Sequence, residues 1–372
     1  MDFTLSDEQA AIFELAGRIL TEKLPPERLK EIEQGDRWFA DDVWAELAKA
    51  DLLGLALPES AGGGGYGFFE LALILEQVGH AVAPVPVLPT LVLGALPIAE
   101  FGTDAQRAGH LPSVIAGEKV LTAALLEGAA LPPAMPACRA ERSGDGWTIT
   151  GAKTLVPAGD IASIALVPAS TGDGEVTVFL VDLSADGVGR ERNVSMNLEP
   201  LTTLTFDAVT VGEDAVLGSV GAGAEIVAWI TDRAIAGTCA LQAGVCEAAT
   251  RMTGSYSSTR KQFDTPIATF QAVAHRVADA YIDTEAIRLT ARQAAWRLGA
   301  GEEAAEEIAM AKYWACSGSH RVVHAAQHVH AGIGVDTDYP VHRTYRWAKH
   351  LEFSLGNGRD HLRRLGDLIA AE

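Results

Sequence analysis

The sequence lacks the features of membrane-spanning and secreted proteins. No apolar run reaches the about 20 residues that a helix needs to cross a bilayer. Acidic residues stand at Asp2, Asp7 and Glu8, where a secretory signal carries basic ones. The four cysteines are too few for a disulfide framework and too far apart for a zinc site. These absences predict a soluble, cytoplasmic protein whose thiols are free.

Basic residues are also scarce relative to acidic ones. Lys and Arg number 29 against 49 Asp and Glu, so the formal net charge is -20. An acidic surface repels nucleic-acid backbones and anionic lipids, and we therefore expect neither nucleic acid nor a membrane as a partner. An anionic ligand must be held by a few local cations, which makes single arginines informative. At 372 residues and 48% hydrophobic, the chain can bury the cores of several domains.

Hydrophobic periodicity divides the chain into three regions. Residues 1–118 have apolar positions at helical spacing and predict an N-terminal α-helical domain. Residues 119–222 contain short segments rich in Val, Ile and Thr between turns, and predict a middle β domain of barrel or sandwich type. Residues 223–372 return to long amphipathic stretches, the last near 340–370, and predict a C-terminal four-helix bundle. The expected fold class is α+β and multi-domain.

Four strings along the chain carry a resemblance to a known family. They are LLGLALPESAGGGGYGFFELALILEQVGHAVAPVP, GWTITGAKTLVPAGDIA, TRKQFDTPIATFQAVAHRVAD and VHAGIGVDTDYPVHRTYRWAK. Their order and separation resemble those of acyl-CoA dehydrogenases over essentially the whole chain. The resemblance implies an enzyme of β-oxidation that binds FAD and oxidises an acyl-CoA thioester to the trans-2-enoyl-CoA. A carboxylate removes the α proton, hydride leaves to the flavin, and an acceptor flavoprotein takes the electrons.

One half of the cofactor site follows from this resemblance. In the family, an Arg-Lys-x-Phe segment reaches across a subunit interface to the FAD diphosphate, and a glycine turn approaches the same cofactor. Here Gln262 stands where relatives often carry threonine, His328 replaces a glutamine, and Ala331 replaces a glycine. The alternative interpretation of Arg260 and Lys261 is that they are simply the charged end of a helix. The cofactor-binding positions so implied are Arg260, Gln262, Phe263, Gln271, His328, Ala331 and Gly332.

The histidines near this turn do not predict a metal site. His324, His328 and His330 are not spaced to bind one ion from a single helical face. We therefore expect no metal.

The other half of the cofactor site departs from the family. The family loop Thr-Glu-Pro-Gly-x-Gly-Ser-Asp, which holds the flavin ring and the substrate carbonyl, aligns with residues 125–132, LLEGAALP. The family Trp-x-Thr aligns with Leu155 and Pro157, which offer no stacking face and no amide proton. Each buried acceptor left unpaired costs about 1–3 kcal/mol. We expect this chain to bind the flavin ring weakly or not at all, unless the loop aligns with a different register.

The catalytic base is also displaced. Leu355, followed by Gly356, occupies the position at which most relatives carry a glutamate and a glycine. Some branches place the carboxylate on a bundle helix one residue before an arginine, and Asp232 before Arg233 holds that position here. Burial beneath an acyl chain raises the pKa of such a carboxyl toward the working range. An ion pair with an arginine is the alternative role of Asp232.

Three functions fit these observations. The first is a subunit of an α2β2 heterotetramer, as in actinobacterial steroid side-chain degradation, which completes the FAD site of a catalytic partner. The second is a self-sufficient homo-oligomeric dehydrogenase that uses Asp232 as its base. The third is a flavin-free module of the same fold that binds acyl-CoA or supports assembly. The first accounts best for one retained and one degraded half of the site, and no residue specifies the acyl group.

Overall fold

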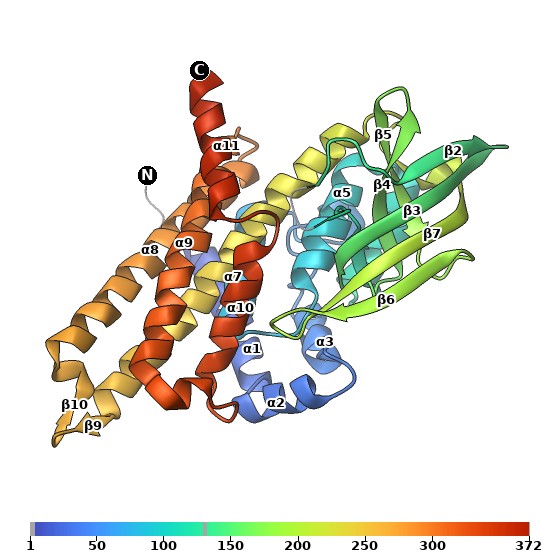
Figure 1. The fold of residues 1–372 in the computed structure, drawn as a ribbon. Coiled ribbons are helices and arrows are strands. Elements are labelled where there is room, and N and C mark those ends of the chain that lie inside the picture. Colours follow the sequence, from blue (N-terminus) through green and yellow to red (C-terminus); the bar gives the residue numbers. More distant parts are fainter. Residues whose placement is uncertain (1–3, 129–131, 372) are drawn as a thin grey trace. The chain divides into compact units, whose positions relative to one another are not determined.

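The computed structural model describes residues 4–128 and 132–371 (Figure 1). Two compact units appear in it. Unit 1 contains residues 4–36, 68–83 and 235–371, and unit 2 contains residues 37–67 and 84–234 without the gap at 129–131. Helix α7 (Gly223–Thr259) begins in unit 2 and ends in unit 1. None of the described helices is both long and apolar enough to cross a membrane.

Unit 1 is helical. Its first helix starts with a reciprocal cap, because Ser6 Oγ accepts from the Gln9 amide (3.2 Å) and Gln9 Oε1 accepts from the Ser6 amide (3.0 Å). Its described α-helices, besides the end of α7, are α1 (Asp7–Lys23), α2 (Pro26–Gln34), α4 (Phe68–His80), α8 (Gln271–Gly299), α9 (Ala305–His330), α10 (Val341–Phe353) and α11 (Gly358–Ala371), and its short helices are η4 (Ile267–Thr269) and η5 (Ala331–Val335).

Glycines let α4 and α7 touch backbone to backbone in this unit. A Cβ on Gly79 would lie 2.0 Å from the Leu241 carbonyl oxygen, and one on Gly244 would lie 1.8 Å from the Glu76 carbonyl oxygen. No other residue type fits at that separation. The two glycines therefore fix how α4 crosses α7.

Unit 2 combines short helices with a mixed sheet of eight strands. The sheet order is β6-β7-β3-β2-β4-β5-β8, and β1 pairs in parallel with β4. The strands are β1 (Leu121–Ala123), β2 (Arg139–Ser143), β3 (Gly146–Pro157), β4 (Ile164–Gly172), β5 (Glu175–Asp182), β6 (Val188–Val194), β7 (Pro200–Gly212) and β8 (Val216–Leu217). The helices are α3 (Asp41–Lys49), η1 (Glu59–Ala61), η2 (Leu88–Ala95), α5 (Leu96–Phe101), α6 (Asp104–Ile115) and η3 (Glu213–Ala215).

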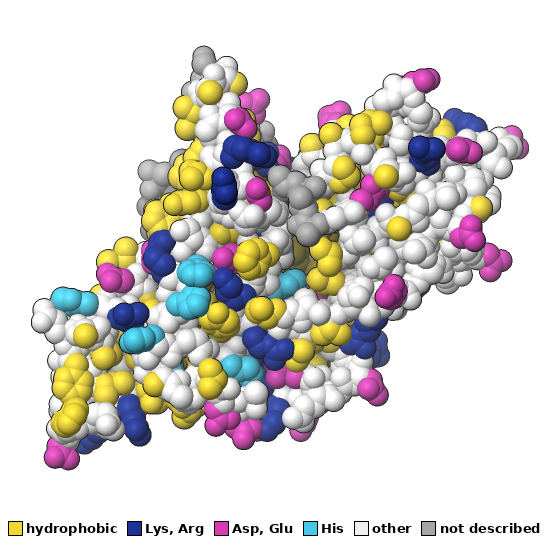
Figure 2. All heavy atoms as spheres, viewed as in Figure 1, with side chains coloured by type: hydrophobic (Ala, Val, Ile, Leu, Met, Phe, Trp, Pro, Cys, Tyr) yellow, Lys and Arg dark blue, Asp and Glu magenta, His cyan; other side chains and the backbone are white. Residues whose placement is uncertain are grey.

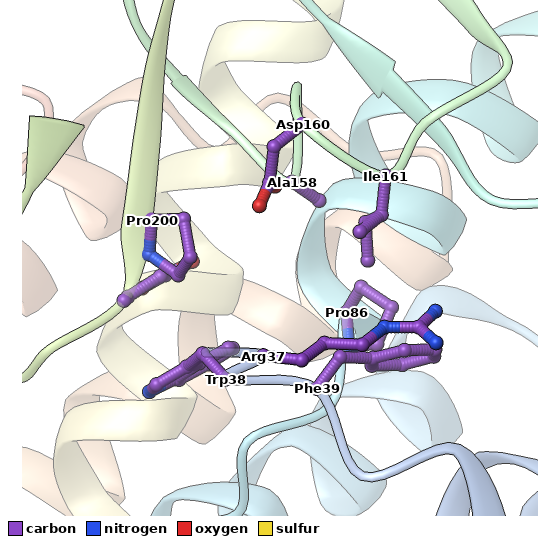
Figure 3. Close-up of a pocket in the computed structure, with 9 residues that line it drawn as sticks. Arg37, Trp38, Phe39, Pro86, Ala158, Asp160, Ile161 and Pro200 are labelled. Atoms are coloured by element: carbon purple, nitrogen blue, oxygen red, sulfur yellow. The ribbon is translucent and has the colours of Figure 1, made fainter. Parts of the chain in front are cut away.

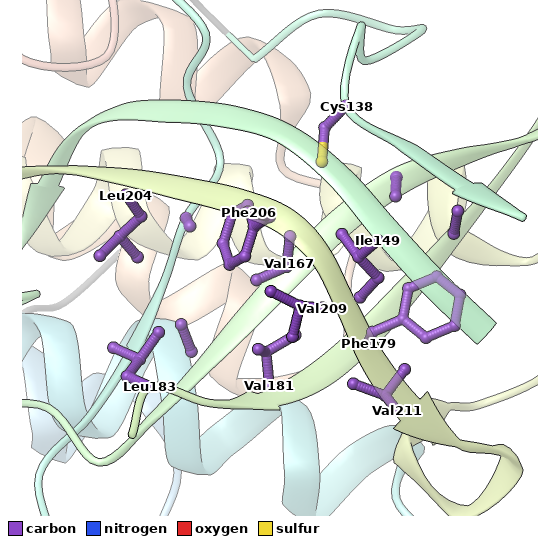
Figure 4. Packing of buried hydrophobic residues seen from close by; sticks show 14 of the residues in the cluster. Cys138, Ile149, Val167, Phe179, Val181, Leu183, Leu204, Phe206, Val209 and Val211 are labelled. Carbon is purple, nitrogen blue, oxygen red and sulfur yellow. The ribbon is translucent and has the colours of Figure 1, made fainter. Parts of the chain in front are cut away.

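Strands of the sheet enclose a core of aliphatic and aromatic side chains (Figure 4). Phe179 is fully buried, and its ring meets Trp147 edge-on at 5.5 Å between centroids. Ile149, Val167 and Phe206 belong to the same buried cluster and come from β3, β4 and β7. Buried positions alternate along most of β7, whereas β4 and β5 have continuous buried runs, as strands covered on both faces do.

The predicted succession of helical, β and helical regions is confirmed. One element differs from its prediction, because the last amphipathic stretch, near 340–370, is two helices. The chain turns between α10 and α11 at Leu355 and Gly356, whose φ angles are 56° and 90°. Two consecutive left-handed residues end a helix.

Candidate functional site

A short hairpin at the start of α8 carries part of the segment implied for the FAD diphosphate. Strands β9 (Lys261–Gln262) and β10 (Thr265–Pro266) pair in antiparallel fashion. Between them Phe263 and Asp264 both have positive φ, 51° and 62°, as a tight type I′ turn requires. Phe263 is 89% exposed and meets Phe270 edge-on at 6.3 Å between ring centroids. A large aromatic ring is thus presented to the outside on a strained turn.

Arg260 follows α7 at the root of this hairpin. Its amide donates to the Tyr256 carbonyl (2.8 Å), and its own carbonyl accepts from the Ile267 amide (2.8 Å). Its side chain is exposed, and no hydrogen bond or ion pair ties the guanidinium to another described residue. A guanidinium meets phosphate oxygens in a bidentate fashion. The backbone of Arg260 is therefore fixed while its charge is available to an external anion.

The two glutamines assigned to the cofactor differ in availability. Gln262 Nε2 donates to the carbonyl of its neighbour Lys261 at 2.8 Å. Gln271 is the first residue of α8 and is exposed. Gln271 can therefore meet an external group without first breaking a bond of its own.

The second implied cofactor element is the turn η5 (Ala331–Val335), which follows α9. Ala331 has φ 53° and ψ -134°. Glycine adopts this region freely, whereas other residues do so at a cost of about 1–3 kcal/mol. Ala331, Gly332 and His328 are all exposed. The turn therefore keeps a glycine-type backbone although its first residue is alanine.

An aromatic cluster links the hairpin root to this turn. The ring of Tyr256 stacks on His330 at 4.5 Å between centroids, and Tyr339 Oη lies 3.4 Å from His330 Nε2. Burial lowers the pKa of His330, so the ring is neutral and Nδ1–H donates to the Ala326 carbonyl (2.8 Å). None of the sequence motifs includes Tyr256, His330 or Tyr339 in this role. The spacing of Tyr256 one helical turn before Arg260 is the signal that was available.

The hairpin and the α9–α10 connection lie at the same end of the unit 1 helices (Figure 1). Figure 2, viewed from the same side, shows hydrophobic side chains uncovered at the end that carries the hairpin. An exposed cation, an exposed aromatic ring and a glycine-type turn thus share one end of unit 1. This donor set suits a dinucleotide, whose diphosphate takes a cation and whose adenine takes an aromatic or backbone surface.

The loop implied for the flavin ring is used internally in unit 2. The Glu127 carboxylate accepts from the amides of Ala137 (2.6 Å) and Cys138 (3.0 Å) and from Lys153 Nζ (2.8 Å), and Lys153 is fully buried. Burial opposes ionisation, but these hydrogen bonds, led by that from Lys153, hold the pKa of Glu127 below its ordinary value. Ala129, Ala130 and Leu131 lie outside the described residues. The polar side chain of this loop is therefore committed to the protein itself.

The positions implied to flank the flavin are apolar. Leu155 sits on a bulge of β3 against β7, with φ 53°, and is 38% exposed. Pro157 has no amide proton, and its carbonyl accepts from Thr122 Oγ1 at 2.7 Å. Thr154 Oγ1 is buried and has no hydrogen-bond partner among the described residues. These residues do not fit a polar ring edge that needs several donors.

The two candidate base positions lie on different elements. Asp232 is half-buried on α7. The guanidinium of the next residue, Arg233, lies over the Trp229 ring at 3.5 Å from its centroid, and burial lowers the pKa of Arg233 to about 10. Leu355 is half-buried in the turn after α10, and nearby Glu352 pairs with Lys349 (2.5 Å). Among these, only Asp232 combines a carboxylate with a family base position.

Unit 2 also contains a crevice beside the end of β3 (Figure 3). Arg37 lies over the Phe39 ring at 5.3 Å from its centroid, and Ala158, Asp160 and Pro200 face it. The volume of the crevice is about 20 Å³, enough for one water molecule. It is too small for an acyl chain or a nucleotide.

Unit 1 contains a larger polar cavity of about 370 Å³ between α1, α4, α7 and α8. Glu76, 4% exposed, accepts from Arg288 Nε (3.1 Å) and Arg292 Nε (3.1 Å), and Arg288 also pairs with Glu247. Burial raises the pKa of Glu76, against the lowering effect of the two guanidinium groups. Each charge has a partner of opposite sign, so the network joins three helices.

Comparison with known proteins places the chain in one family. Sequence profiles of the acyl-CoA dehydrogenase N-terminal and C-terminal domains match residues 6–118 and 221–367. The chain is 36% identical to acyl-CoA dehydrogenase FadE27 of Mycobacterium tuberculosis, over 100% of this chain and 99% of that one. The chain belongs to the acyl-CoA dehydrogenase family.

Two solved structures are similar along the whole length. The ChsE4-ChsE5 complex from Mycobacterium tuberculosis matches with a TM-score of 0.93 and 36% identity, covering 100% of each chain. A variant of the Tcur3481-Tcur3483 steroid acyl-CoA dehydrogenase matches with a TM-score of 0.91 and 42% identity, covering 99% of each chain. The predicted fold and the predicted class, an oxidoreductase that acts on CH–CH bonds with a flavin, are confirmed.

Proposed function

We propose that this chain is a subunit of a heterotetrameric acyl-CoA dehydrogenase and completes the FAD site of a catalytic partner. The observation that carries the proposal is the contrast between two sets of residues. Arg260, Phe263 and Ala331 are exposed, and the backbones of Phe263 and Ala331 are strained, in an arrangement suited to a dinucleotide. Leu155 and Leu355 stand where a flavin ring and a base are needed.

Strain is the strongest support on the retained side. An alanine in a glycine-type conformation persists only when the surroundings demand that backbone. The stack of His330 on Tyr256 supplies such a demand, because it fixes the end of α9 against the end of α7. The conformation of the turn is thus retained although its glycine is lost.

Each retained residue has a separable role toward the cofactor. The Arg260 guanidinium holds the diphosphate, and the exposed backbone of Ala331 and Gly332 allows close approach of the adenosine. Phe263 and Gln271 cover the remaining faces of the cofactor. When bound, FAD supplies the hydride acceptor of the reaction, and the proton-abstracting carboxylate comes from the partner.

The relatives support both the assembly and the substrate class. The ChsE4-ChsE5 complex joins two differently named chains, and the Tcur3481-Tcur3483 enzyme is described as a steroid dehydrogenase. We extend both features to this chain. Its substrate is then the CoA thioester of a steroid side chain or another bulky acyl group, and its electrons pass to an acceptor flavoprotein.

Co-expression tests the proposal. The partner is a second acyl-CoA dehydrogenase chain of the same genome with an intact Thr-Glu-Pro-Gly-x-Gly-Ser-Asp loop and a Glu-Gly base. We expect a yellow complex with unlike subunits, and we expect Arg260→Gln to release its FAD. Arg363→Gln, which changes an exposed arginine of α11 outside the hairpin and the turn η5, is the matched control and leaves FAD in place.

The alternatives give different outcomes in the same experiment. Stoichiometric FAD on the chain alone, with turnover abolished by Asp232→Asn, identifies a self-sufficient homo-oligomer. A colourless chain that stays colourless with every such partner identifies a flavin-free binding or assembly module.

A further inference from the structure

Four side-chain donors converge on the carboxyl end of α10 and on the turn after it. The last carbonyls of a helix have no partner within the helix. Here one donor from the turn itself, on Ser354, and three donors from α9 and α11 reach carbonyls between residues 350 and 355. The pairs are Ser354 Oγ with the His350 carbonyl (2.9 Å), Lys312 Nζ with Leu351 (2.6 Å), Cys316 Sγ with Glu352 (3.2 Å) and His361 Nε2 with Leu355 (2.9 Å).

Lys312 is the most costly of these donors to bury. Its side chain is fully buried on α9, and no carboxylate lies within ion-pair distance of it in the described part of the chain. A buried ammonium without a carboxylate is strongly unfavourable unless another negative group compensates. The carboxyl end of α10 carries partial negative charge and supplies that compensation. The position of Lys312 is therefore explained by the helix end that it caps.

His361 fixes the turn itself. It is fully buried on α11, and burial lowers its pKa to about 4, so the ring is neutral near pH 7. With Nε2 protonated, it donates to the carbonyl of Leu355. Leu355 has φ 56°, which is unfavourable for leucine, and this hydrogen bond is one of the contacts that hold it there. His361 thus holds the backbone of Leu355, and Lys312 holds the end of α10 at Leu351, four residues before it.

We propose that Lys312 and His361 are positioning residues that keep position 355 in the geometry of a base-bearing turn. The chain has then lost the carboxylate at this position and kept the support for it. The assignment of position 355 as a base position rests on the proposed function. The rigidity of the turn rests only on the hydrogen bonds above.

Hydrogen exchange of the full chain, resolved by mass spectrometry, tests the support. In Lys312→Met and His361→Phe we expect the amides of residues 353–357 to exchange at least about tenfold faster, and unit 2 amides to change less than about twofold. Lys153→Met, which removes a fully buried lysine from unit 2, is the matched control and leaves the turn protected. His361→Gln keeps a side-chain N–H donor, and we expect it to restore protection.

A second readout follows position 355 directly. The four native cysteines are buried, so Leu355→Cys introduces a thiol whose labelling rate reports on this turn. We expect His361→Phe to raise that rate about tenfold, and Lys153→Met to leave it unchanged. The proposal is overturned if His361→Phe and Lys153→Met accelerate the labelling of the thiol at position 355 equally. It is also overturned if hydrogen exchange rises uniformly in all amides. Neither readout uses flavin, so its failure is distinct from a failure to retain FAD with a partner.

Discussion

Ala331→Gly should stabilise unit 1, because it removes a methyl group from a backbone conformation that only glycine adopts freely. The φ and ψ angles of 53° and -134° cost an alanine about 1–3 kcal/mol. Against this, folding costs a glycine about 0.5–1 kcal/mol more than an alanine, because glycine has more conformational entropy in the unfolded chain. The difference leaves a net gain in the free energy of unfolding of about 1 kcal/mol, within a range of about 0–2.5 kcal/mol.

Differential scanning calorimetry measures this gain. For a unit of roughly 150–250 residues, 1 kcal/mol shifts Tm by about 2–4 °C, so the expected rise is about 3 °C and at most about 10 °C. Ala274→Gly is the matched control, because Ala274 is exposed inside α8 and has an ordinary helical backbone. Ala274→Gly should lower the free energy of unfolding by about 0.5–1 kcal/mol. If Ala331→Gly lowers Tm as the control does, the strain is absent and the retained glycine-type turn was misinterpreted.

Three further predictions follow from the ion pairs and the exposed arginine. Glu76→Gln leaves Arg288 and Arg292 without their shared carboxylate and should cost about 3–5 kcal/mol in urea unfolding, whereas loss of less than about 1 kcal/mol would show that the network is not cohesive. Because the pKa of Glu127 is depressed in the folded protein, the carboxylate stabilises the fold above the ordinary pKa of 4.5, and this stabilisation is lost as the pH falls below 4.5. Glu127→Gln should remove that part of the dependence of stability on pH, and an unchanged pH profile would contradict this role of Glu127. Arg260→Gln should weaken FAD retention by the co-expressed complex about 10–100-fold in dialysis, and unaltered retention would place the diphosphate elsewhere.

The order of helical and β regions could be predicted from the sequence because both periodicities are local. The family followed from four motifs in register, which specify close backbone approaches and charges that few other folds need. The break between α10 and α11 could not be predicted in this way. Leu355 has little preference for positive φ, and the donors that hold it there come from positions about 40 residues earlier and on the next helix. The domain boundaries 1–118, 119–222 and 223–372 stay predictions.

The candidate site was predicted residue by residue only where a motif marked it. Arg260 and Ala331 belong to such motifs, but Tyr256 and His330 meet across about 70 residues of sequence, and no local pattern announces their stack. Glu127 illustrates the same limit, because its partners lie on the approach to β2 and on β3. Long-range hydrogen bonds decide which polar side chains remain available to a ligand.

The most direct test of the central claim is the flavin content of this chain purified by itself, measured beside the complex with its partner. We expect a colourless chain alone and one FAD for each pair of unlike subunits in the complex. A single chain that retains FAD one to one and desaturates an acyl-CoA without any partner would contradict it.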